Sequence, residues 1–201
     1  MDAASWDERY RGTDLVWGLA PNRWVEREVA ALPPGRALDL ACGEGRNAVW
    51  LAARGWSVTA VDFSAVGLEK GRALEDREIG TATIDWVVAD ATTYAPPEPA
   101  DLALLCYLQL IATERRAAVR QAAQALAPGG TLLVIGHDSR NRTEGTGGPP
   151  DPAVLFTAAD VAGDLAGLGL AIESADEVLR PVDGAERPAI DALLRASRPR
   201  L

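Results

Sequence analysis

Short apolar runs alternate along the chain with segments in which apolar residues recur at helical spacing. Alternating strands and helices are typical of a parallel sheet with helices on both faces and right-handed crossovers, so the pattern predicts a doubly wound α/β fold. The predicted strands cover residues 36–41, 57–61, 83–89, 100–106 and 131–136, and the predicted helices cover residues 46–54, about 64–77 and about 113–126.

Turn and cap residues mark where these elements begin and end. Ser64, Thr113 and Thr157 each stand before a predicted helix, and we expect their side chains to cap it. The sequence Pro-Gly-Gly at residues 128–130 is expected to turn the chain before the strand at 131–136.

The last third of the chain is less regular. Residues 138–152 are polar, rich in glycine and proline, and too many for a simple connection, so we expect a mobile cover over a site. A predicted helix over about 157–168 and a predicted strand over 170–180 follow. For residues 188–198 the periodicity is compatible with a strand and with a helix.

A glycine-rich turn follows the first predicted strand. Ligands of open parallel sheets bind beyond the carboxyl ends of the strands, and this turn lies there. Residues 43–48 fit the pattern G-x-G-x-x-G/A, and Asp62 stands at the end of the next strand, where a ribose-binding carboxylate is expected. By spacing alone, a nicotinamide dinucleotide and S-adenosylmethionine (SAM) are nearly equal candidates.

The charges around the turn favour SAM. Asp39 precedes the turn and Glu44 lies between its glycines, where carboxylates oppose the pyrophosphate of a dinucleotide. SAM instead presents an ammonium and a sulfonium group, which carboxylates stabilise. In this interpretation Asp62 pairs with the ribose hydroxyls, and Asp90, after the third strand, reaches the adenine amino group.

Composition narrows the class of protein further. The 201 residues carry a net charge of −9, which repels nucleic acid and anionic membranes, so we expect a small-molecule partner and a single-domain protein that is a monomer or a homodimer. The start of the chain does not resemble a signal peptide, and we expect a cytoplasmic location. Two cysteines and one histidine do not make a conventional zinc site, so we expect no metal.

Four motifs in order carry a resemblance to a known family. They are Leu-Asp-Leu-Ala-Cys-Gly-Glu-Gly at 38–45, Val-Asp-Phe-Ser at 61–64, Ala-Asp-Ala at 89–91 and Leu-Ala-Pro-Gly-Gly-Thr at 126–131. Over essentially its whole length the chain resembles the class I SAM-dependent methyltransferases. Residues 45–52, together with Trp-Asp-Glu-Arg-Tyr at 6–10, resemble more particularly the tellurite-resistance and thiopurine-type small-molecule methyltransferases.

This resemblance implies a Rossmann-like sheet of seven strands with the last one antiparallel, which makes residues 188–198 a strand. It also implies that an N-terminal helical segment, residues 1–34, covers the site, and that residues 35–201 form the SAM-binding domain. SAM is then the cofactor and S-adenosylhomocysteine (SAH) the product. The expected cofactor-binding residues are Tyr10, Trp17, Asp39, Ala41, Gly43, Gly45, Arg46, Asn47, Asp62, Phe63, Asp90, Ala91 and Cys106.

Methyl transfer by in-line displacement depends mainly on positioning, so the missing catalytic triad is no objection. A hydroxyl or amine acceptor gains from a base, whereas a thiolate or a chalcogen anion needs little help. His137 and Tyr107 follow the fifth and fourth strands and are the candidate catalytic residues; alternatively His137 fixes the next loop and Tyr107 lines the wall. Trp6, Arg180 and Arg187 are candidate substrate-binding residues, although both arginines have carboxylates nearby with which to pair.

Three functions remain open at this stage. The first is methyl transfer from SAM to a small molecule such as a thiol, a chalcogen anion or a phenol. The second is a nicotinamide-dependent oxidoreductase, which is disfavoured because Lys70, the only lysine, has Val66 in place of the tyrosine of the Tyr-x-x-x-Lys pair of short-chain dehydrogenases. The third is a protein that binds SAM without transferring its methyl group.

Overall fold

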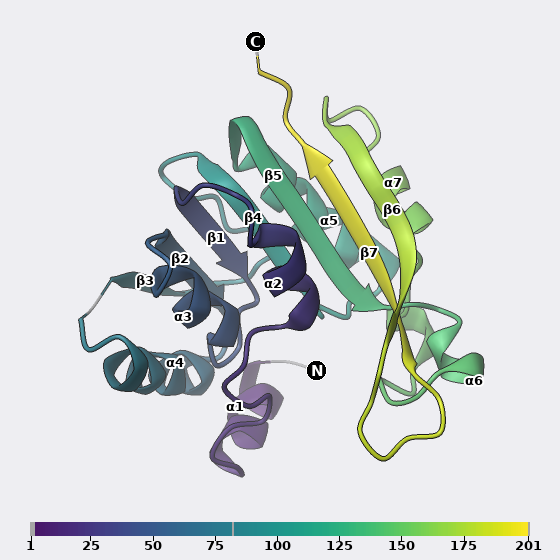
Figure 1. The fold of residues 1–201 in the computed structure, drawn as a ribbon, viewed down its shortest axis with the longest axis horizontal. Coiled ribbons are helices and arrows are strands. Elements are labelled where there is room, and N and C mark those ends of the chain that lie inside the picture. Colours follow the sequence, from purple (N-terminus) through teal and green to yellow (C-terminus); the bar gives the residue numbers. More distant parts are fainter. Residues whose placement is uncertain (1–2, 82, 201) are drawn as a thin grey trace.

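A computed structural model describes residues 3–81 and 83–200, and the strands within them form one sheet in the order β3-β2-β1-β4-β5-β7-β6 (Figure 1). Neighbouring strands are parallel from β3 through β5, whereas β7 is antiparallel to both β5 and β6. The predicted seven-stranded sheet with its last strand antiparallel is therefore confirmed. The strands are β1 (Arg36–Leu40), β2 (Ser57–Asp62), β3 (Ile84–Val88), β4 (Ala100–Cys106), β5 (Leu126–His137), β6 (Ala171–Arg180) and β7 (Ala189–Ser197).

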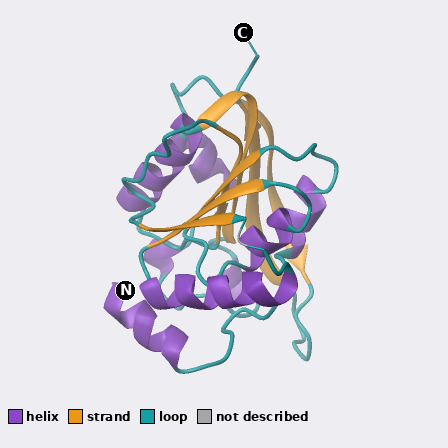
Figure 2. Cartoon of the chain, turned by 90° about the vertical axis from the view of Figure 1, so that its left-hand side faces the viewer, coloured by secondary structure: helices purple, strands orange, loops and turns teal. Residues whose placement is uncertain are grey.

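Helices pack on both faces of the twisted sheet (Figure 2). Apolar residues of α2, α3 and α4 join one buried cluster, and those of α5 and α7 join the other. Within the described residues, no helix is long and apolar enough to cross a membrane. The helices are α1 (Ala3–Arg11), α2 (Arg23–Val29), α3 (Arg46–Ala52), α4 (Ala65–Glu78), α5 (Ala112–Gln124), α6 (Asn141–Glu144), the 3-10 helix η1 (Pro152–Val154) and α7 (Ala158–Asp164).

The central strands are buried on both sides. Along β4, Leu102 and Leu104 face the cluster with α2 and α3, whereas Ala103 and Leu105 face the cluster with α5 and α7. A strand covered on both faces needs apolar residues at every position, which explains why the sequence shows a continuous apolar run there rather than an alternating one.

Two of the three predicted caps are confirmed. The Ser64 side chain accepts a hydrogen bond from the Gly67 amide at the start of α4, and Thr157 forms a reciprocal capping box at the start of α7. The prediction for Thr113 is wrong, because α5 begins one residue earlier, at Ala112, and its N-cap is Ile111, whose side chain has no polar group. Burial of the apolar face of α5 stabilises its start without a side-chain cap.

Residues 128–130 lie inside β5 rather than in a turn before it. The pairing of β4 with β5 shifts between Ala100 and Leu102, so this stretch forms an irregularity in the strand. Gly129 has a φ of 86°, a conformation that favours glycine. The breaker residues therefore mark a bulge, because strand pairing continues on both sides of them.

The polar segment 138–152 contains α6 and leads into η1. Asn141, which is buried, joins this segment to β7: its side-chain oxygen accepts from the Ile190 amide at 2.7 Å, and its amide group donates to the Gly147 carbonyl at 2.8 Å. These bonds hold the segment beside the end of β5. The predicted mobility of the segment stays a prediction.

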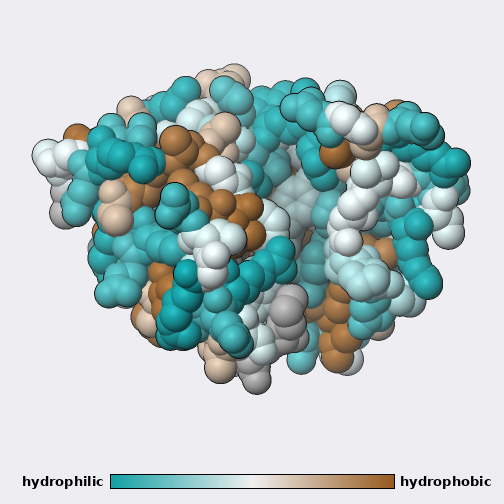
Figure 3. All heavy atoms as spheres, turned by 90° about the horizontal axis from the view of Figure 1, so that it is seen from below, coloured by the Kyte–Doolittle hydropathy of each residue, from teal (hydrophilic) through white to brown (hydrophobic). Residues whose placement is uncertain are grey.

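The carboxyl ends of β1 to β5 lie along the lower edge of the sheet in Figure 1, and α1 lies below this edge. Because β7 runs the opposite way, its first residues lie at this same edge, with Asp191 paired with His137. Seen from below, this side of the molecule is hollowed near its middle (Figure 3). Residues from the beginning of β7 therefore join those that end the parallel strands.

Candidate active site

The turn after β1 depends on its glycines. Ala41, Gly43 and Gly45 have φ angles of 58°, 58° and 73°, in the left-handed region. A Cβ atom added at Gly45 would lie 2.3 Å from a ring carbon of Trp86, so this position has no space for a side chain. The turn therefore brings the backbone close to the β3 indole and starts α3 at Arg46.

Asp62, at the end of β2, is fixed against this turn. Its Oδ2 accepts from the Gly43 amide and its Oδ1 from the Ser64 amide, both at 2.8 Å. Burial raises the pKa of Asp62, although these amide bonds favour the charged form. The carboxylate predicted to bind ribose thus lies beside the glycine turn, and Phe63 follows it at the surface with 37 % exposure.

Asp39 is a buried carboxylate whose charge Arg46 compensates only in part. It is 1 % exposed, and neither of its oxygens has a hydrogen-bond partner among the described residues. Burial and the nearby charge of Asp62 raise the pKa of Asp39 to about 7, while Arg46 acts in the opposite direction. A buried, unpaired carboxylate is unfavourable, and a bound cation would relieve it.

Glu44 corrects the charge interpretation made from the sequence. It was expected to favour the cations of SAM, but its carboxylate turns to the N-terminal segment instead. It accepts from the Val16 amide at 2.8 Å and the Trp17 amide at 3.3 Å, and it lies 3.3 Å from Nζ of Lys70. Because these partners satisfy Glu44, the preference for a positively charged ligand depends on Asp39.

Further bonds attach the N-terminal segment to the glycine turn. Lys70 donates to the backbone carbonyls of Tyr10 and Thr13, and Asn47 on α3 accepts from the Asn22 amide at 2.8 Å. The Tyr10 side chain is buried, and its hydroxyl lies 2.7 Å from where a Cβ of Gly43 would be. Burial raises the pKa of Tyr10, so its hydroxyl stays protonated.

We expect Lys70→Met to loosen this attachment, because it leaves Glu44 buried without its cation and frees two carbonyls. A hydrogen bond to a charged group contributes roughly 1.5–3 kcal/mol, so amide exchange over residues 3–17 should rise about tenfold or more. Hydrogen-exchange mass spectrometry measures this, with Arg77→Met, an exposed cation on the same helix, as the control. Equal exchange in the two variants would contradict the attachment.

An aromatic group lies next to this attachment. The ring of Trp6 is 5.4 Å from that of Tyr10 and 6.3 Å from that of Trp17, and the guanidinium of Arg9 lies over both tryptophans. The Trp17 carbonyl accepts from Arg46 at 3.1 Å. Trp6, predicted to bind substrate, therefore lies with the residues predicted to bind the cofactor.

The turn after β3 is organised by Asp90. Its Oδ1 accepts from the amide and the hydroxyl of Thr92, both at 2.8 Å, and the side chain is exposed. Ala91, the next residue, is buried. The predicted contact of Asp90 with an adenine ring stays a prediction.

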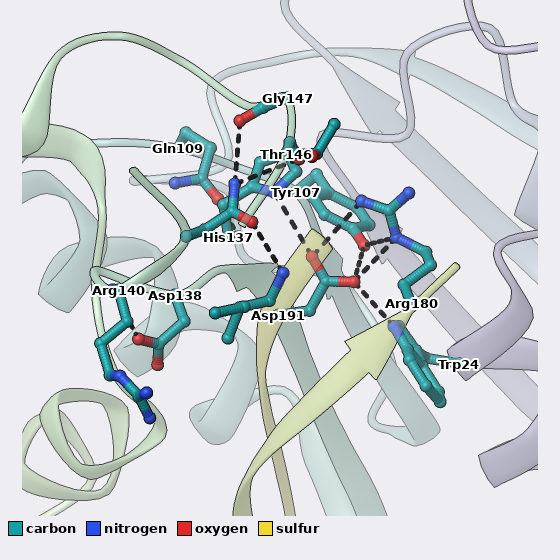
Figure 4. A network of polar contacts seen from close by, with 12 residues as sticks. Trp24, Tyr107, Gln109, His137, Asp138, Arg140, Thr146, Gly147, Arg180 and Asp191 are labelled. Atoms are coloured by element: carbon teal, nitrogen blue, oxygen red, sulfur yellow. Dashed lines mark hydrogen bonds and ion pairs between the residues drawn. The ribbon is translucent and has the colours of Figure 1, made fainter. Parts of the chain in front are cut away.

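A second group of predicted residues converges on a side chain that the sequence reasoning missed (Figure 4). Four described side chains surround the fully buried carboxylate of Asp191. Its Oδ2 accepts from the Tyr107 hydroxyl at 2.6 Å, from Nε of Arg180 at 2.8 Å and from the Trp24 indole at 2.9 Å, and its Oδ1 lies 3.3 Å from Nδ1 of His137. We call these five residues the Asp191 cluster.

Asp191 is ionised under all ordinary conditions. Burial alone would raise its pKa, but the nearby His137 nitrogen and the hydrogen bonds from Arg180, Tyr107 and Trp24 lower it to about 2. Tyr107 responds in the opposite way, because burial and the Asp191 charge both raise its pKa. Its hydroxyl is therefore a neutral donor, and the guanidinium of Arg180 already pairs with Asp191 rather than standing free for an anionic acceptor.

His137 is held from three sides. Its backbone amide donates to Oε1 of Gln109 at 2.8 Å, its ring centre lies 4.9 Å from that of Tyr107, and a Cβ on Gly148 would lie 3.1 Å from the imidazole. Nδ1 is buried and makes no well-aligned hydrogen bond within the described residues, with Asp191 as its ion-pair neighbour. The imidazole thus has one nitrogen directed at a carboxylate.

Two predicted residues stand apart from the Asp191 cluster. Arg187 is exposed between β6 and β7, where it donates to the Thr143 carbonyl at 3.3 Å. Cys106, at the end of β4, has its pKa raised to about 12, chiefly by burial, so it is a neutral thiol. One feature of the sequence could have indicated Asp191. It is the single carboxylate in the apolar run 189–194.

Comparison with known proteins agrees with this geometry. Residues 37–130 match the model of a methyltransferase domain family. The chain is 33 % identical over 124 residues to a demethylmenaquinone methyltransferase of Clavibacter sepedonicus, covering 61 % of this chain and 48 % of the relative. It is 30 % identical over 159 residues to thiocyanate methyltransferase 1 of Brassica oleracea, and the match covers 78 % of this chain and 65 % of that relative. The chain therefore spans less than two thirds of the length of these relatives.

Solved structures resemble the fold over nearly the whole chain. One, described as the conversion of a disulfide bond into a thioacetal group during echinomycin biosynthesis, superposes with a TM-score of 0.77 at 25 % identity and covers 98 % of this chain and 91 % of its own. Other structures of this fold are methyltransferases with SAM or SAH bound. The strand order, the glycine turn, the match to a methyltransferase domain and these relatives together support a class I SAM-dependent methyltransferase.

Proposed function

We propose that the protein transfers the methyl group of SAM to a small-molecule acceptor. The observation that carries this proposal is Asp39, a buried carboxylate without a partner among the described residues, beside a glycine turn at the carboxyl edge of the sheet. A cationic ligand there offsets the unfavourable burial of its charge, whereas a pyrophosphate would add to it. SAM supplies an electrophilic methyl group on a sulfonium that is a good leaving group.

The residues around the turn suggest how SAM is held. Asp39 faces the positive charge, and Asp62 accepts hydrogen bonds from the ribose hydroxyls. Tyr10 and the rest of the N-terminal segment, up to residue 34, cover the cofactor, and residues 35–201 form the domain that binds it. The attachment through Glu44 and Lys70 supports this division, because it holds the segment over the turn.

We assign the acceptor to the Asp191 cluster, which shares the edge of the sheet with the turn. Holding a nucleophile in line with the methyl group lowers the barrier by roughly 7–11 kcal/mol, so positioning is the main requirement. His137 is the base where the nucleophile carries a proton. Similarity to a thiocyanate methyltransferase supports a sulfur nucleophile, and the net charge of −9 supports a small molecule over nucleic acid.

Calorimetric titration with SAM, SAH and NADH tests the cofactor. We expect SAM and SAH to bind with a Kd on the order of 10 μM and NADH not to bind. Asp62→Ala should abolish binding, because it removes the carboxylate fixed between the Gly43 and Ser64 amides. Asp85→Ala, which removes an exposed carboxylate of β3, is the matched control and should bind as the native protein does.

Two other results would each favour another function. Binding of NADH alone would contradict the proposal and favour an oxidoreductase. Binding of SAM, with no SAH formed in the presence of thiols, chalcogen anions or phenols, would indicate a protein that binds SAM without transferring its methyl group.

A further inference from the structure

The Asp191 cluster joins five elements that are far apart in the sequence. Trp24 comes from α2, Tyr107 follows β4, His137 ends β5, Arg180 ends β6 and Asp191 is near the start of β7. Asp191 is fully buried, and its closest partners are 2.6 to 2.9 Å away. Three donors bind Oδ2 and fix the position of the carboxylate. The carboxylate can therefore orient a polar group that lies next to its other oxygen, Oδ1.

The other oxygen, Oδ1, lies 3.3 Å from Nδ1 of His137 and accepts only a long hydrogen bond, at 3.5 Å, from Nη2 of Arg180. An ionised carboxylate only accepts hydrogen bonds, so the nitrogen next to it carries the hydrogen. Nε2 of the same ring is then left with its lone pair. We propose that Asp191 is a positioning residue that holds His137 in the tautomer able to remove a proton from the methyl acceptor. This inference rests on the methyl transfer proposed above.

The other groups of the cluster are unsuited to this role. Tyr107 uses its hydroxyl hydrogen on Asp191, and Arg180 keeps its charge at any ordinary pH. The thiol of Cys106, at the end of the neighbouring strand, is buried and neutral. His137 is therefore the base among these described side chains.

The charges of the cluster also indicate the class of acceptor. Arg180 and Asp191 neutralise each other, and His137 adds no charge in the neutral form that a base requires, so in that form the cluster holds no surplus positive charge for an anion. A neutral acceptor with a proton on its nucleophilic atom, a thiol or a phenol, fits this balance. A preformed anion such as thiocyanate does not.

The proton balance is complete with these groups. The S–H or O–H bond of the acceptor breaks and its proton goes to Nε2 of His137. The freed electron pair forms the bond to the methyl carbon, whose bond to the sulfonium breaks with its electrons on sulfur, which gives SAH. His137 then releases the proton to water.

Nitrogen-15 NMR tests the positioning role directly, because His137 is the only histidine of the chain. With tag-free protein above about pH 9, where an ordinary imidazole is neutral, we expect the hydrogen on Nδ1. In Asp191→Asn the side-chain amide donates to Nδ1, so the hydrogen moves to Nε2. Asp164→Asn is the matched control, because it removes a buried carboxylate from a separate pair with Arg115 and should leave the tautomer unchanged.

Hydrogen on Nε2 in the native protein would overturn the positioning role, even if Asp191→Asn does not fold. The same tautomer in native and Asp191→Asn protein would also overturn it. These spectra need no cofactor, so they decide the role of Asp191 separately from SAM binding. If the native protein binds no SAM, the proposed function fails while the tautomer result still stands.

Turnover tests the acceptor class. With an alkyl thiol, which keeps its proton near neutral pH, and with phenol as probes, we expect Asp191→Asn to lower kcat about 100-fold with little change in KM, because general-base catalysis contributes at least that factor. SAH formation with thiocyanate alone, equal in native protein and variant, would overturn the acceptor class. Absence of any methylated thiol or phenol would overturn it as well.

Discussion

Asp39→Asn is expected to remove most of the pH dependence of SAM binding. In the free protein, burial and Asp62 raise the pKa of Asp39 to about 7, so below that pH the carboxyl is largely protonated and must lose its proton to face a cation. Between about pH 5.5 and 7 the affinity of the native protein for SAM should rise more than about tenfold. The amino group of SAM stays protonated in this range, since α-amino groups titrate near roughly 7.7.

The variant separates this effect from other titrating groups. Asp39→Asn should bind SAM about as weakly as the native protein does at low pH, with little further change as the pH rises. Calorimetry in buffers of different ionisation enthalpy should show proton release on binding by the native protein only. An unchanged pH dependence in the variant would refute the role of Asp39.

Asp39 should also make the stability of the free protein depend on pH. This stability should fall as the pH rises, whereas the affinity for SAM should rise. A carboxyl whose pKa is higher in the folded than in the unfolded state binds extra protons when folded, so stability falls as the pH rises from 3.8 through about 7. Without SAM, Asp39→Asn should therefore have the higher Tm at pH values above about 7. Asp85→Asn, in which the carboxyl lost is exposed, should melt as the native protein does.

Gly45→Ala is expected to lower the free energy of unfolding by about 3 kcal/mol or to prevent folding, because it combines two penalties. The residue has a φ of 73°, and its new Cβ would lie 2.3 Å from the Trp86 ring, which is itself held by a bond from its indole to Glu75 at 2.8 Å. Denaturation in urea measures the loss.

Two other glycines separate the penalties. Gly80 has a φ of 76° with nothing within 4 Å, so Gly80→Ala tests backbone strain alone and should cost about 1 kcal/mol. Gly71 lacks a positive φ, but its Cβ would lie 2.5 Å from Trp86, so Gly71→Ala tests the clash without backbone strain, against a gain of about 1 kcal/mol in helix propensity within α4. If Gly45→Ala lowers the free energy of unfolding no more than Gly80→Ala does, the clash with Trp86 does not contribute to the loss of stability.

The sheet was predictable because its signals are local. Apolar runs and helical periodicity gave the strands and helices up to residue 136 within a few residues, and the side chains of Ser64 and Thr157 cap their own helices. Thr113 has the same chemistry without the role, because the packing of α5 sets its start at Ala112. The antiparallel direction of the last strand came from resemblance, since periodicity does not report direction.

The site was predictable only in part, for a physical reason. Glycine turns and strand-end carboxylates act at fixed spacing, so the sequence predicts that Asp39, Gly43 and Asp62 lie together, and the structure brings them together. Glu44 has the same chemistry, yet tertiary contacts with Val16, Trp17 and Lys70 decide where it points. Asp191 was missed because its partners are 11 to 167 residues away, and only an antiparallel β7 brings it to the carboxyl edge.

One stretch of chain, residues 16–24, contacts both halves of the site. The Val16 amide bonds to Glu44, the Asn22 amide to Asn47 and the Trp24 indole to Asp191. In a chimeric enzyme, residues 16–24 therefore could not be replaced independently of the glycine turn and the Asp191 cluster. A version taken from another methyltransferase would have to bring compatible residues at positions 44, 47 and 191, so donor and acceptor specificity would change together.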